Sequence, residues 1–456
     1  MKEQLQNLRN YFNTGATKKY LFRIEQLKKI SFALKKYEKE ILIALHTDLG
    51  KCEAEAYASE IAIVQNEIKF FIKQLKRLMQ PKEVSTNLMN LPGKSKIYYE
   101  PLGIVLIIAP WNYPFQLAFN PLVGAIAAGN CVVVKPSEFA NATSLIMEKI
   151  VKEIFSEDYI YLVQGDGAQI VPTIIEEGSI NHVFYTGSTS VGKLIYEMAA
   201  KKLIPVTLEL GGKSPCVIED DANLKIAAKR VVIGKFINAG QTCIAPDYLL
   251  IHKKIKAKFL EILISTIQSF YTNNAALSKD YGKIINEKRF NTLISFLQQG
   301  KIIYGGKYDK ESLYIEPTIM QEIPTNAPIN HEEIFGPILP IFDFETQSEA
   351  VEIIKQNATP LAFYIFTSST TKEENWINAI PFGGGCINNT AYHFTNHHLP
   401  FGGIGLSGIG SYHGKKSFYT FTHAKPVLKS ATWFDPNIKY PPFKGKLRWL
   451  KMILKL

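Results

Sequence analysis

The stretch GIVLIIAPWNYPFQLAFNPLVGAIAAGNCVVVKP, residues 103–136, has two short apolar runs on either side of a longer apolar segment. The runs GIVLIIAP and CVVVKP are rich in β-branched residues and have the length of buried strands. The segment between them indicates an apolar helix that ends near Gly129. A strand, a helix and a second strand in this order predict a parallel sheet covered by helices on both faces.

The same alternation continues toward the C-terminus. Further helices are expected from Asn141 and from Ser190. The strands that alternate with them are YIYLVQG, HVFYTG (His182 to Gly187) and PVTLELGG (Pro205 to Gly212). The predicted fold class is therefore α/β, and this region is predicted to be a Rossmann-like nucleotide-binding domain.

A second α/β stretch begins after Gly212. Its expected strands are PCVIED, YLLIHK and GCINNT, and a helix is expected to run up to Cys243. At 456 residues the chain exceeds what one hydrophobic core usually organises. We therefore predict that this stretch is a separate domain.

The first 80 residues predict amphipathic helices, and residues 82–101 predict a protruding β-hairpin around the turn LPGK. The apolar positions at helical spacing are Leu21, Ile24, Leu27, Phe32, Leu34, Ile41, Ile43 and Leu45.

The composition excludes several classes of protein. The formal net charge is +11, but the basic residues are scattered except for one excess at the C-terminus, so nucleic-acid binding is not expected. The N-terminus lacks the apolar run of a signal peptide, and the longest apolar runs are shorter than a membrane-spanning helix. Five widely spaced cysteines without a C-x-x-C pair predict neither disulfides nor zinc. These features indicate a soluble cytoplasmic protein.

Three glycine-rich motifs need separate interpretation. GSTSVGK, residues 187–193, follows a strand like a phosphate loop, yet the next residue is Leu194 where Mg²⁺ binding needs Ser or Thr. A P-loop NTPase is the alternative that this loop leaves open, whereas a dinucleotide would suit the helix N-terminus without Mg²⁺. PFGGIGLSGIG lies late in the chain and indicates a tight loop, and LELGGKSP contains the carboxylate Glu209.

Several motifs together resemble the aldehyde dehydrogenase superfamily over nearly the whole chain. They are PWNYPF, KPSE, FYTGS (Phe184 to Ser188), LELGGKSP, NAGQTCIAPD, EEIFGP and PFGG, in the order and spacing of that family. The short N-terminus and the endings SYHGKKSF and YPPFKGK resemble its class 3 branch of fatty-aldehyde and aromatic-aldehyde enzymes, in a bacterial form. The resemblance implies a Rossmann-like NAD-binding domain, an α/β catalytic domain and a small β bridging element.

The resemblance also assigns three catalytic residues. Cys243 would attack the aldehyde as a thiolate, and a thiol of ordinary pKa needs help to ionise at pH 7. Asn112 would hold the resulting oxyanion together with the backbone N–H of Cys243. Glu209 would activate the water that hydrolyses the thioester, which favours a free acid as the product. The other cysteines are interpreted as small buried hydrophobic residues.

The implied cofactor is NAD, with NADP as the alternative. Lys135 and Glu138 would approach the adenosine ribose, where a carboxylate opposes an added 2′-phosphate. The further cofactor-binding residues implied are Trp111, Gly187, Ser188, Val191, Glu333 and Phe335.

The aldehyde tunnel is expected to be lined by Tyr113, Thr242, His393 and Phe394. Medium or long aliphatic and aromatic aldehydes are the expected substrates. A carotenoid-terminal aldehyde and a catalytically retired structural paralogue are the alternatives. No metal is expected, because the histidines of the loop AYHFTNHH lack acidic or cysteine partners.

The resemblance divides the chain into four parts and implies a homodimer. The expected parts are 1–81 and 102–209 with a return at about 406–421 for the NAD-binding domain, 210–405 for the catalytic domain, 82–101 and 422–430 for the bridging hairpin, and 431–456 for the basic tail.

The end of the tail has a distinctive pattern. In KGKLRWLKMILKL, residues 444–456, basic and apolar side chains separate on a helical wheel. The tail could therefore lie on an anionic membrane, pack on the protein or be disordered.

Overall fold

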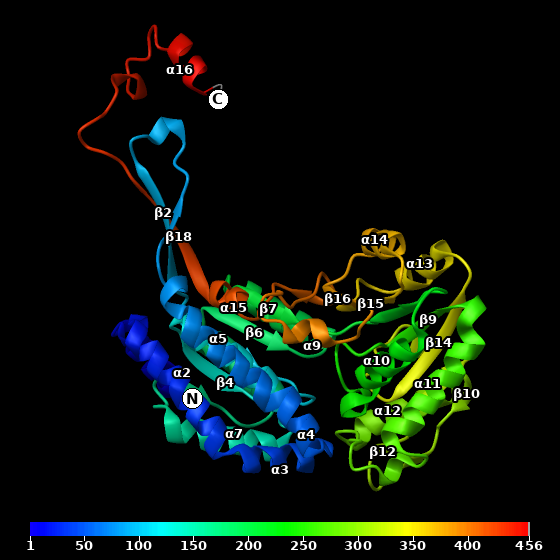
Figure 1. The fold of residues 1–456 in the computed structure, drawn as a ribbon. Helices are drawn as coiled ribbons and strands as arrows, with labels where there is room; N and C mark the ends of the chain where they lie inside the picture. Colours follow the sequence, from blue (N-terminus) through cyan, green and yellow to red (C-terminus); the bar gives the residue numbers. More distant parts are fainter. Residues whose placement is uncertain (455–456) are drawn as a thin grey trace.

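The computed structural model describes residues 1–454 and contains a six-stranded sheet built around the stretch 103–136 (Figure 1). Five strands are parallel, and the short β17 joins antiparallel at one edge. The sheet order is β17 (Gly408–Ile409), β7 (Val206–Glu209), β6 (His182–Thr186), β3 (Ile104–Ile108), β4 (Cys131–Lys135) and β5 (Ile160–Leu162). The strand order reverses between β3 and β6, and ligands bind at the carboxyl ends of strands at such a switch point.

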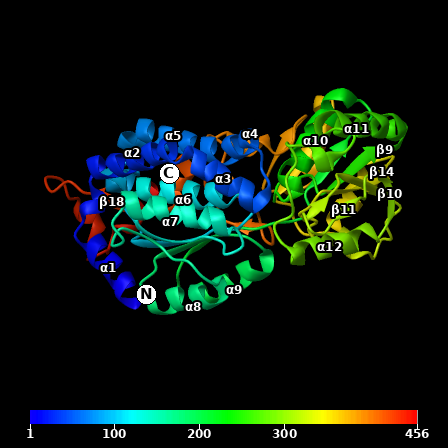
Figure 2. The ribbon, with the colours of Figure 1, turned by 90° about the horizontal axis from the view of Figure 1, so that it is seen from below.

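Helices cover both faces of this sheet, as the parallel strands require (Figure 2). The helix α6 (Pro114–Ala128) is buried along its whole length and stops before Gly129, whose φ of 90° ends the helix, as predicted. Together with α7 (Asn141–Ile154) it lies on one face, while α8 (Gly167–Glu177) and α9 (Thr189–Ala200) lie on the other.

The N-terminal segment forms α1 (Lys2–Asn13), α2 (Tyr20–Lys36), α3 (Glu38–Leu49), α4 (Glu53–Ala56) and α5 (Ala62–Leu78), with a π-helical turn at Tyr57–Ile61 between the last two. Of these helices, α2, α3 and α5 form an outer layer on α6 and α7, whereas α1 contacts the strands β3, β4 and β5. The helices are as predicted, but the apolar set is partly wrong. Leu21, Phe32 and Ile43 are exposed on the outer surface, because their helices turn other apolar residues toward the protein.

The second α/β stretch forms a seven-stranded sheet beside the first (Figure 1). All its strands are parallel except the edge strand β10. The sheet order is β10 (Lys301–Tyr304), β13 (Thr318–Gln321), β14 (Ile338–Phe344), β9 (Tyr248–His252), β8 (Pro215–Ile218), β15 (Ala362–Phe366) and β16 (Gly384–Ile387). The helices are α10 (Leu224–Phe236), α11 (Lys256–Tyr271), α12 (Glu287–Leu297), α13 (Gln347–Lys355) and α14 (Thr370–Ala379).

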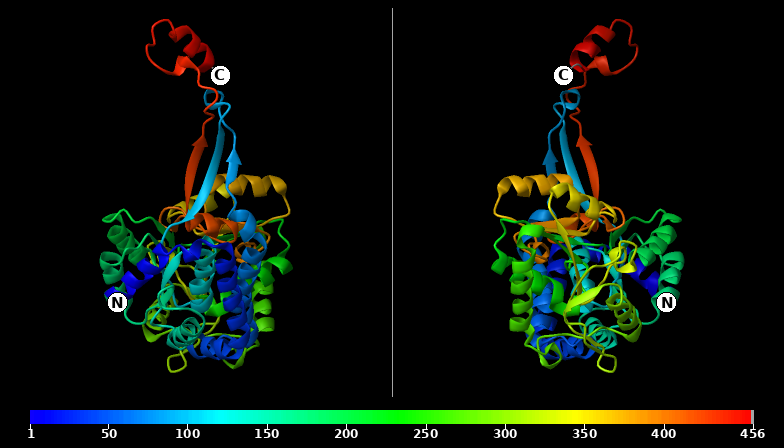
Figure 3. Two further views of the ribbon diagram at one scale, coloured as in Figure 1. Left: turned by 90° about the vertical axis from the view of Figure 1, so that its left-hand side faces the viewer. Right: turned by 90° about the vertical axis from the view of Figure 1, so that its right-hand side faces the viewer.

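The predicted hairpin is present and pairs with a strand from near the C-terminus. The strands β1 (Lys82–Val84), β2 (Lys94–Pro101) and β18 (Thr422–Lys429) form an antiparallel sheet that projects from the body (Figure 3). Beyond it, the tail ends in α16 (Leu447–Leu454) near the far end of the hairpin, and positions 455 and 456 of the predicted tail lie outside the described residues. Within residues 1–454, no helix combines the length and the apolar content that crossing a membrane requires.

Candidate active site

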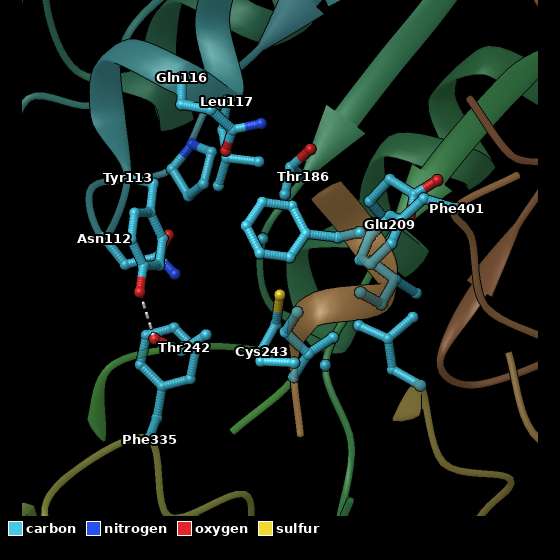
Figure 4. A pocket seen from close by; sticks show the side chains of 18 of the residues that line it. Asn112, Tyr113, Gln116, Leu117, Thr186, Glu209, Thr242, Cys243, Phe335 and Phe401 are labelled. Atoms are coloured by element: carbon cyan, nitrogen blue, oxygen red, sulfur yellow. Dashed lines mark hydrogen bonds between the residues drawn. The ribbon is translucent and has the colours of Figure 1, made fainter. Parts of the chain in front are cut away.

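A cavity of about 760 Å³ lies between the two large sheets. Its walls come from the loops that follow β3, β6 and β7 and from the loop that precedes β9. The cavity therefore lies at the switch point of the six-stranded sheet, where open α/β sheets bind ligands. The side chains of Asn112, Cys243 and Glu209 reach it from three different parts of the chain (Figure 4).

The loop that carries Cys243 has an unusual backbone. The helix α10 ends at Phe236, so the prediction of a helix running up to Cys243 is wrong. Asn238 and Ala239 take left-handed conformations, with φ of 54° and 50°, and Gly240 follows with φ of 75°. A Cβ at Gly240 would lie 2.2 Å from the carbonyl oxygen of Gly336, so only glycine fits there.

Side-chain hydrogen bonds hold this strained loop in place. The side-chain amide of Gln241 donates to the carbonyl oxygens of Asn238 and Lys283, at 3.0 and 2.9 Å, and its oxygen accepts from the N–H of Ile285. Asn238 donates through Nδ2 to the carbonyl oxygen of Gln241 at 3.1 Å. Left-handed residues of this kind persist only where the surroundings impose them, and they gather at functional sites.

The thiol of Cys243 faces the cavity and is half-buried. Burial raises the pKa of this thiol to about 12, and the carboxyl groups of Glu333 and Glu209 act in the same direction. The N–H groups of Cys243 and Ile244 oppose the rise but do not cancel it. At neutral pH the thiol is therefore protonated in the protein without ligands, and attack requires that a base remove the proton.

The rate at which iodoacetamide modifies Cys243 should rise steadily with pH in the protein without cofactor. Only the thiolate reacts, and below a pKa of about 12 its fraction grows about tenfold per pH unit. Between pH 7 and 9 the rate should thus rise about 100-fold without a plateau. Peptide mass spectrometry resolves Cys243 from the other four cysteines, and a plateau near pH 8 would contradict the raised pKa.

Asn112 lies in the loop between β3 and α6 and is buried. Its Nδ2 donates to the carbonyl oxygen of Gln241 at 3.0 Å, which joins this loop to the one that carries Cys243. An amide nitrogen carries two hydrogens, so one remains for a group in the cavity. The structure thus brings Asn112 and Cys243 together at the same cavity.

Glu209 ends β7, and its buried side chain lies on the other side of the Cys243 thiol from Asn112 (Figure 4). Gly187 donates its N–H to the backbone oxygen of Glu209 at 3.0 Å, and Gly408 pairs with it on the other strand edge. Within residues 1–454, no group donates a hydrogen bond to either carboxyl oxygen of Glu209. Burial raises the pKa of this carboxyl well above its usual range, so it can hold or accept a proton near neutral pH.

One end of the cavity fits a nicotinamide dinucleotide. Ser188 caps α9, and Ser188, Thr189 and Ser190 line the cavity at this helix N-terminus, where the first N–H groups lack partners within the helix. A Cβ at Gly187 would lie 2.3 Å from the Tyr185 hydroxyl, so this position requires glycine and no side chain covers the backbone. Val191 donates its N–H to the Ser188 side chain and is exposed outside the cavity wall, so its contact with a cofactor stays a prediction.

Lys135 and Glu138 form an ion pair at the carboxyl end of β4, with 2.9 Å between Nζ and Oε2. Lys135 is buried, while Glu138 is partly exposed and accepts the N–H of Gly167 at 3.4 Å. Neither side chain lines the cavity, and the pair lies beyond its edge. A carboxylate in this position suits ribose hydroxyl groups at the outer end of a bound dinucleotide.

Glu333 and Phe335 line the cavity between the two sheets. The Glu333 carboxyl packs on Gly211, where a Cβ would lie 2.0 Å from Oε2, and burial raises the pKa of Glu333 to about 8. The ring of Phe335 meets that of Trp111 edge-on at 5.3 Å. Arg289 holds this loop by donating to the backbone oxygens of Glu333 and Phe335.

Three of the four residues expected in the aldehyde tunnel line the cavity. Tyr113 and Thr242 line the cavity and share a hydrogen bond of 2.7 Å, and Phe394 also lines it. His393 is not on the cavity wall. It is buried behind the wall, where its ring stacks on Phe401 and its Nδ1 lies 3.7 Å from the Cys386 sulfur, because the short helix at Tyr392–Thr395 turns it inward.

Other cavity residues were missed by the sequence analysis. Thr186, Tyr412 and His413 lie in quoted motifs but had no role assigned to them, and most of the others come from segments distant in the chain. Among these residues are Ala58, Ser59, Ile63, Gln116, Leu117, Thr186, Ile233, Ile237, Tyr412 and His413.

Comparison with known proteins assigns the family. The model of the aldehyde dehydrogenase family matches residues 5–427. The chain is 46% identical to 4,4'-diaponeurosporen-aldehyde dehydrogenase of Staphylococcus aureus, covering 100% of this chain and 99% of that protein. It is 41% identical to aldehyde dehydrogenase family 3 member A2 of Rattus norvegicus, covering 100% and 94%.

Solved structures agree. The substrate-bound state of Staphylococcus aureus AldH is similar with a TM-score of 0.97 at 45% identity, covering 99% of both chains. Betaine aldehyde dehydrogenase from Staphylococcus aureus in complex with NAD⁺ is similar with a TM-score of 0.84 at 27% identity, covering 95% of this chain and 89% of that one. The match over nearly the full length, together with a thiol, an amide and a carboxyl around one cavity, shows that the chain belongs to the aldehyde dehydrogenase family.

Proposed function

We propose that the protein oxidises an aldehyde to a carboxylic acid with NAD(P)⁺ as the oxidant, through a thioester on Cys243 and with the help of Asn112 and Glu209. The oxidation of aldehydes follows from the family. The residue roles rest on one observation, which is that a thiol, a free amide hydrogen and a carboxyl without partners converge on the same cavity. This convergence favours the dehydrogenase over both the P-loop NTPase and the retired paralogue.

The first step is the attack of the sulfur on the aldehyde carbon. The Cys243 thiol gives its proton to a base, either ionised Glu209 or solvent, and the thiolate forms a bond to the carbonyl carbon while the π electrons move to oxygen. The second hydrogen of the Asn112 amide and the N–H of Cys243 stabilise this oxyanion. Such preorganised donors strengthen as charge develops, which makes them typical of acyl-transfer sites.

The nicotinamide of bound NAD(P)⁺ supplies the hydride acceptor for the adduct carbon. Trp111 and Phe335 wall the cavity at the point where the ring would lie, and Glu333 would bind the adjoining ribose. Gly187 and Ser188 would face the pyrophosphate. We assign this binding to the unit of residues 1–81, 102–209 and 406–421, with NAD preferred because Glu138 repels a 2′-phosphate.

Hydrolysis then releases the acid. Glu209, having passed its proton to solvent, accepts a proton from water, and the oxygen attacks the thioester carbon. The carbon–sulfur bond breaks, and Cys243 leaves as a thiolate that is protonated again. Within residues 1–454 no group donates a hydrogen bond to the Glu209 carboxyl, so its oxygens are available to accept a proton.

Apolar aldehydes are the proposed substrate class. The tunnel side of the cavity presents Ile63, Leu117, Ile233 and Phe394, which offer apolar contacts along the path to Cys243. The 46% identical relative is named for a diaponeurosporene aldehyde, which supports a long polyene aldehyde as a second candidate.

The expected result of a substrate series is that kcat/KM rises with aldehyde chain length. Each buried CH₂ adds about 0.8 kcal/mol, or about fourfold, until the tunnel is filled. NADH formation from acetaldehyde, hexanal, decanal, benzaldehyde and a polyene aldehyde measures this directly. A flat profile, or a preference for acetaldehyde, would contradict an apolar tunnel.

We also propose that the chain forms a homodimer through the bridging hairpin, residues 82–101 and 422–430. Seven of the eight residues of β18 are exposed, including Val427 and Leu428, although the strand is fully paired with β2 on one edge. A projecting apolar surface of this kind favours association with a second copy. A monomeric mass in light scattering at micromolar concentration would contradict this proposal.

The tail is proposed to lie on anionic membrane surfaces. Trp449, Met452 and Leu454 of α16 are each more than half exposed, and basic residues adjoin them. Removal of residues 444–456 should reduce co-sedimentation with phosphatidylglycerol vesicles about tenfold at low salt, and high salt should weaken binding of the full chain. Neutral phosphatidylcholine vesicles serve as the control, and equal binding of full-length and shortened protein would contradict the proposal.

A further inference from the structure

A buried ion pair lies directly beneath the loop that carries Asn112. Lys51, just after α3, and Glu60, in the π-helical turn, have no exposed side-chain surface, and their Nζ and Oε1 atoms are 2.5 Å apart. Burying two charges costs free energy that their attraction only partly offsets, so a buried pair is weak support for a role in stability alone. The other contacts of Lys51 and Glu60 explain why a charged pair is buried at this place.

Glu60 supplies the N-cap that α6 lacks. The residue before the helix, Tyr113, makes no capping hydrogen bond with its side chain. Instead, Oε2 of Glu60 accepts the N–H groups of Phe115 and Gln116, at 3.1 and 2.9 Å. A carboxylate at this position satisfies two free donors and matches the positive end of the helix dipole. Glu60 thereby fixes the point at which the loop enters α6.

Lys51 holds the same loop at Asn112, which lies before the two residues that Glu60 binds. Its Nζ donates to the backbone oxygen of Asn112 at 3.0 Å and lies 4.0 Å from the centre of the Tyr113 ring. The backbone oxygen of Asn112 also accepts Nδ2 of Asn238 at 2.8 Å. Both the backbone and the side chain of Asn112 are thus tied, the first to the ion pair and the second to Gln241.

The π-helical turn determines which way Glu60 points. The wider turn at Tyr57–Ile61 lets Ala58 and Ser59 line the cavity while Glu60, the next residue, is buried against α6. Such turns are rare in helices and occur mostly at functional sites. One irregular turn therefore contributes both to the wall of the tunnel and to the support of Asn112.

We propose that Lys51 and Glu60 are positioning residues, which hold the Asn112 amide where it meets the oxyanion formed on Cys243. Lys51 and Glu60 bind the backbone of the loop and of the first turn of α6, and Lys51 also lies against the Tyr113 ring. Neither residue lines the cavity, so the pair acts through the loop that carries Asn112 and touches no substrate. This inference rests on the proposed role of Asn112. A displacement of about 1 Å at such a donor can cost about 10²-fold in rate.

The test is a double-mutant cycle between Lys51→Met and Asn112→Ala. In the otherwise natural chain, Lys51→Met should lower kcat about 10²-fold and leave the KM for NAD unchanged. In the Asn112→Ala background, the same change should lower kcat by no more than about threefold, because the group it positions is already gone. Thermal unfolding of all variants is measured as well. The losses in Tm need not depend on the Asn112 background in the way that the losses in kcat do.

Arg23→Met is the matched control. Arg23 is also buried, and it donates to the backbone oxygen of Ala127 at 3.0 Å, at the opposite end of α6. It should lower Tm with little change in kcat. If Lys51→Met alone does not fold, the double variant Lys51→Met/Glu60→Gln leaves no unpaired charge and still lacks the hydrogen bond to Asn112, so the same loss of kcat is expected.

The outcomes separate the two hypotheses. Equal losses of kcat in both backgrounds, or an unchanged kcat in folded Lys51→Met, would overturn the positioning role while leaving that of Asn112 intact. A normal kcat in Asn112→Ala would instead show that the proposed oxyanion donor is wrong, and the inference would fail with it.

Discussion

Replacing Cys243 with serine is expected to lower the rate of NADH formation from decanal by at least about 10⁴-fold. Serine nearly matches the shape of cysteine, so the loop at Asn238–Gly240 should keep its conformation. A serine hydroxyl is far less acidic than even a thiol whose pKa is raised to about 12, and it is a much weaker nucleophile at neutral pH. The loss should therefore fall on chemistry and not on folding.

Cys386→Ser is a suitable control for Cys243→Ser. Cys386 is also half-buried and unbonded to another cysteine, but it lies outside the cavity wall. Its replacement should leave the rate within about twofold of the natural chain, as for most changes outside a site. Retention of more than about a hundredth of the activity in folded Cys243→Ser, judged by unchanged NAD binding, would refute the thioester route.

Glu209→Gln should convert steady turnover into a single burst of NADH. Attack and hydride transfer need the base only once, through a proton that solvent can also take, whereas hydrolysis depends on the activation of water. We expect about one NADH per active site, followed by a steady rate lower by about 10³-fold. Intact-protein mass spectrometry after the burst should show the acyl group on Cys243.

The pH dependence gives a second measure of Glu209. Burial raises the pKa of its carboxyl, and only the ionised form accepts a proton, so steady turnover of the natural chain should fall as pH is lowered through this pKa. The slow turnover of Glu209→Gln should lack this fall. A steady rate in the variant equal to that of the natural chain, with no acylated protein, would contradict the role as base.

A buried glutamate elsewhere controls for loss of charge. Glu219 follows β8 and is buried outside the cavity wall, where it accepts the Trp376 Nε1–H at 2.7 Å. Glu219→Gln preserves an acceptor there and should show steady turnover without a burst. The contrast distinguishes a specific need for Glu209 from a general effect of replacing a buried carboxyl.

Much of the fold was predictable because local patterns were consistent with it. The apolar strands around residues 103–136 are continuous, since parallel strands are buried on both faces, and the helix between them stops at Gly129 where φ is positive. The helix starts predicted at Asn141 and Ser190 fall within one residue of α7 and α9. In each case, residues close together in the sequence are enough to predict the element.

The site was only partly predictable. The motif residues Asn112, Glu209 and Cys243 do line one cavity, although their catalytic roles stay predictions. Helical periodicity counted Leu21 and other apolar residues that are in fact exposed. The loop sequence suggested His393 for the tunnel, because it did not show that a short helix turns that ring inward.

The sequence by itself determined the α/β alternation and the chemical identity of the thiol, amide and carboxyl, because both depend on residue type and local order. Only the tertiary structure decided that Lys51 and Glu60 pair beneath Asn112, that Glu209 has no hydrogen-bond partner within residues 1–454, and that Cys243 lies in an environment that opposes its ionisation. These properties arise from burial and from contacts between segments far apart in the chain, which no local pattern encodes.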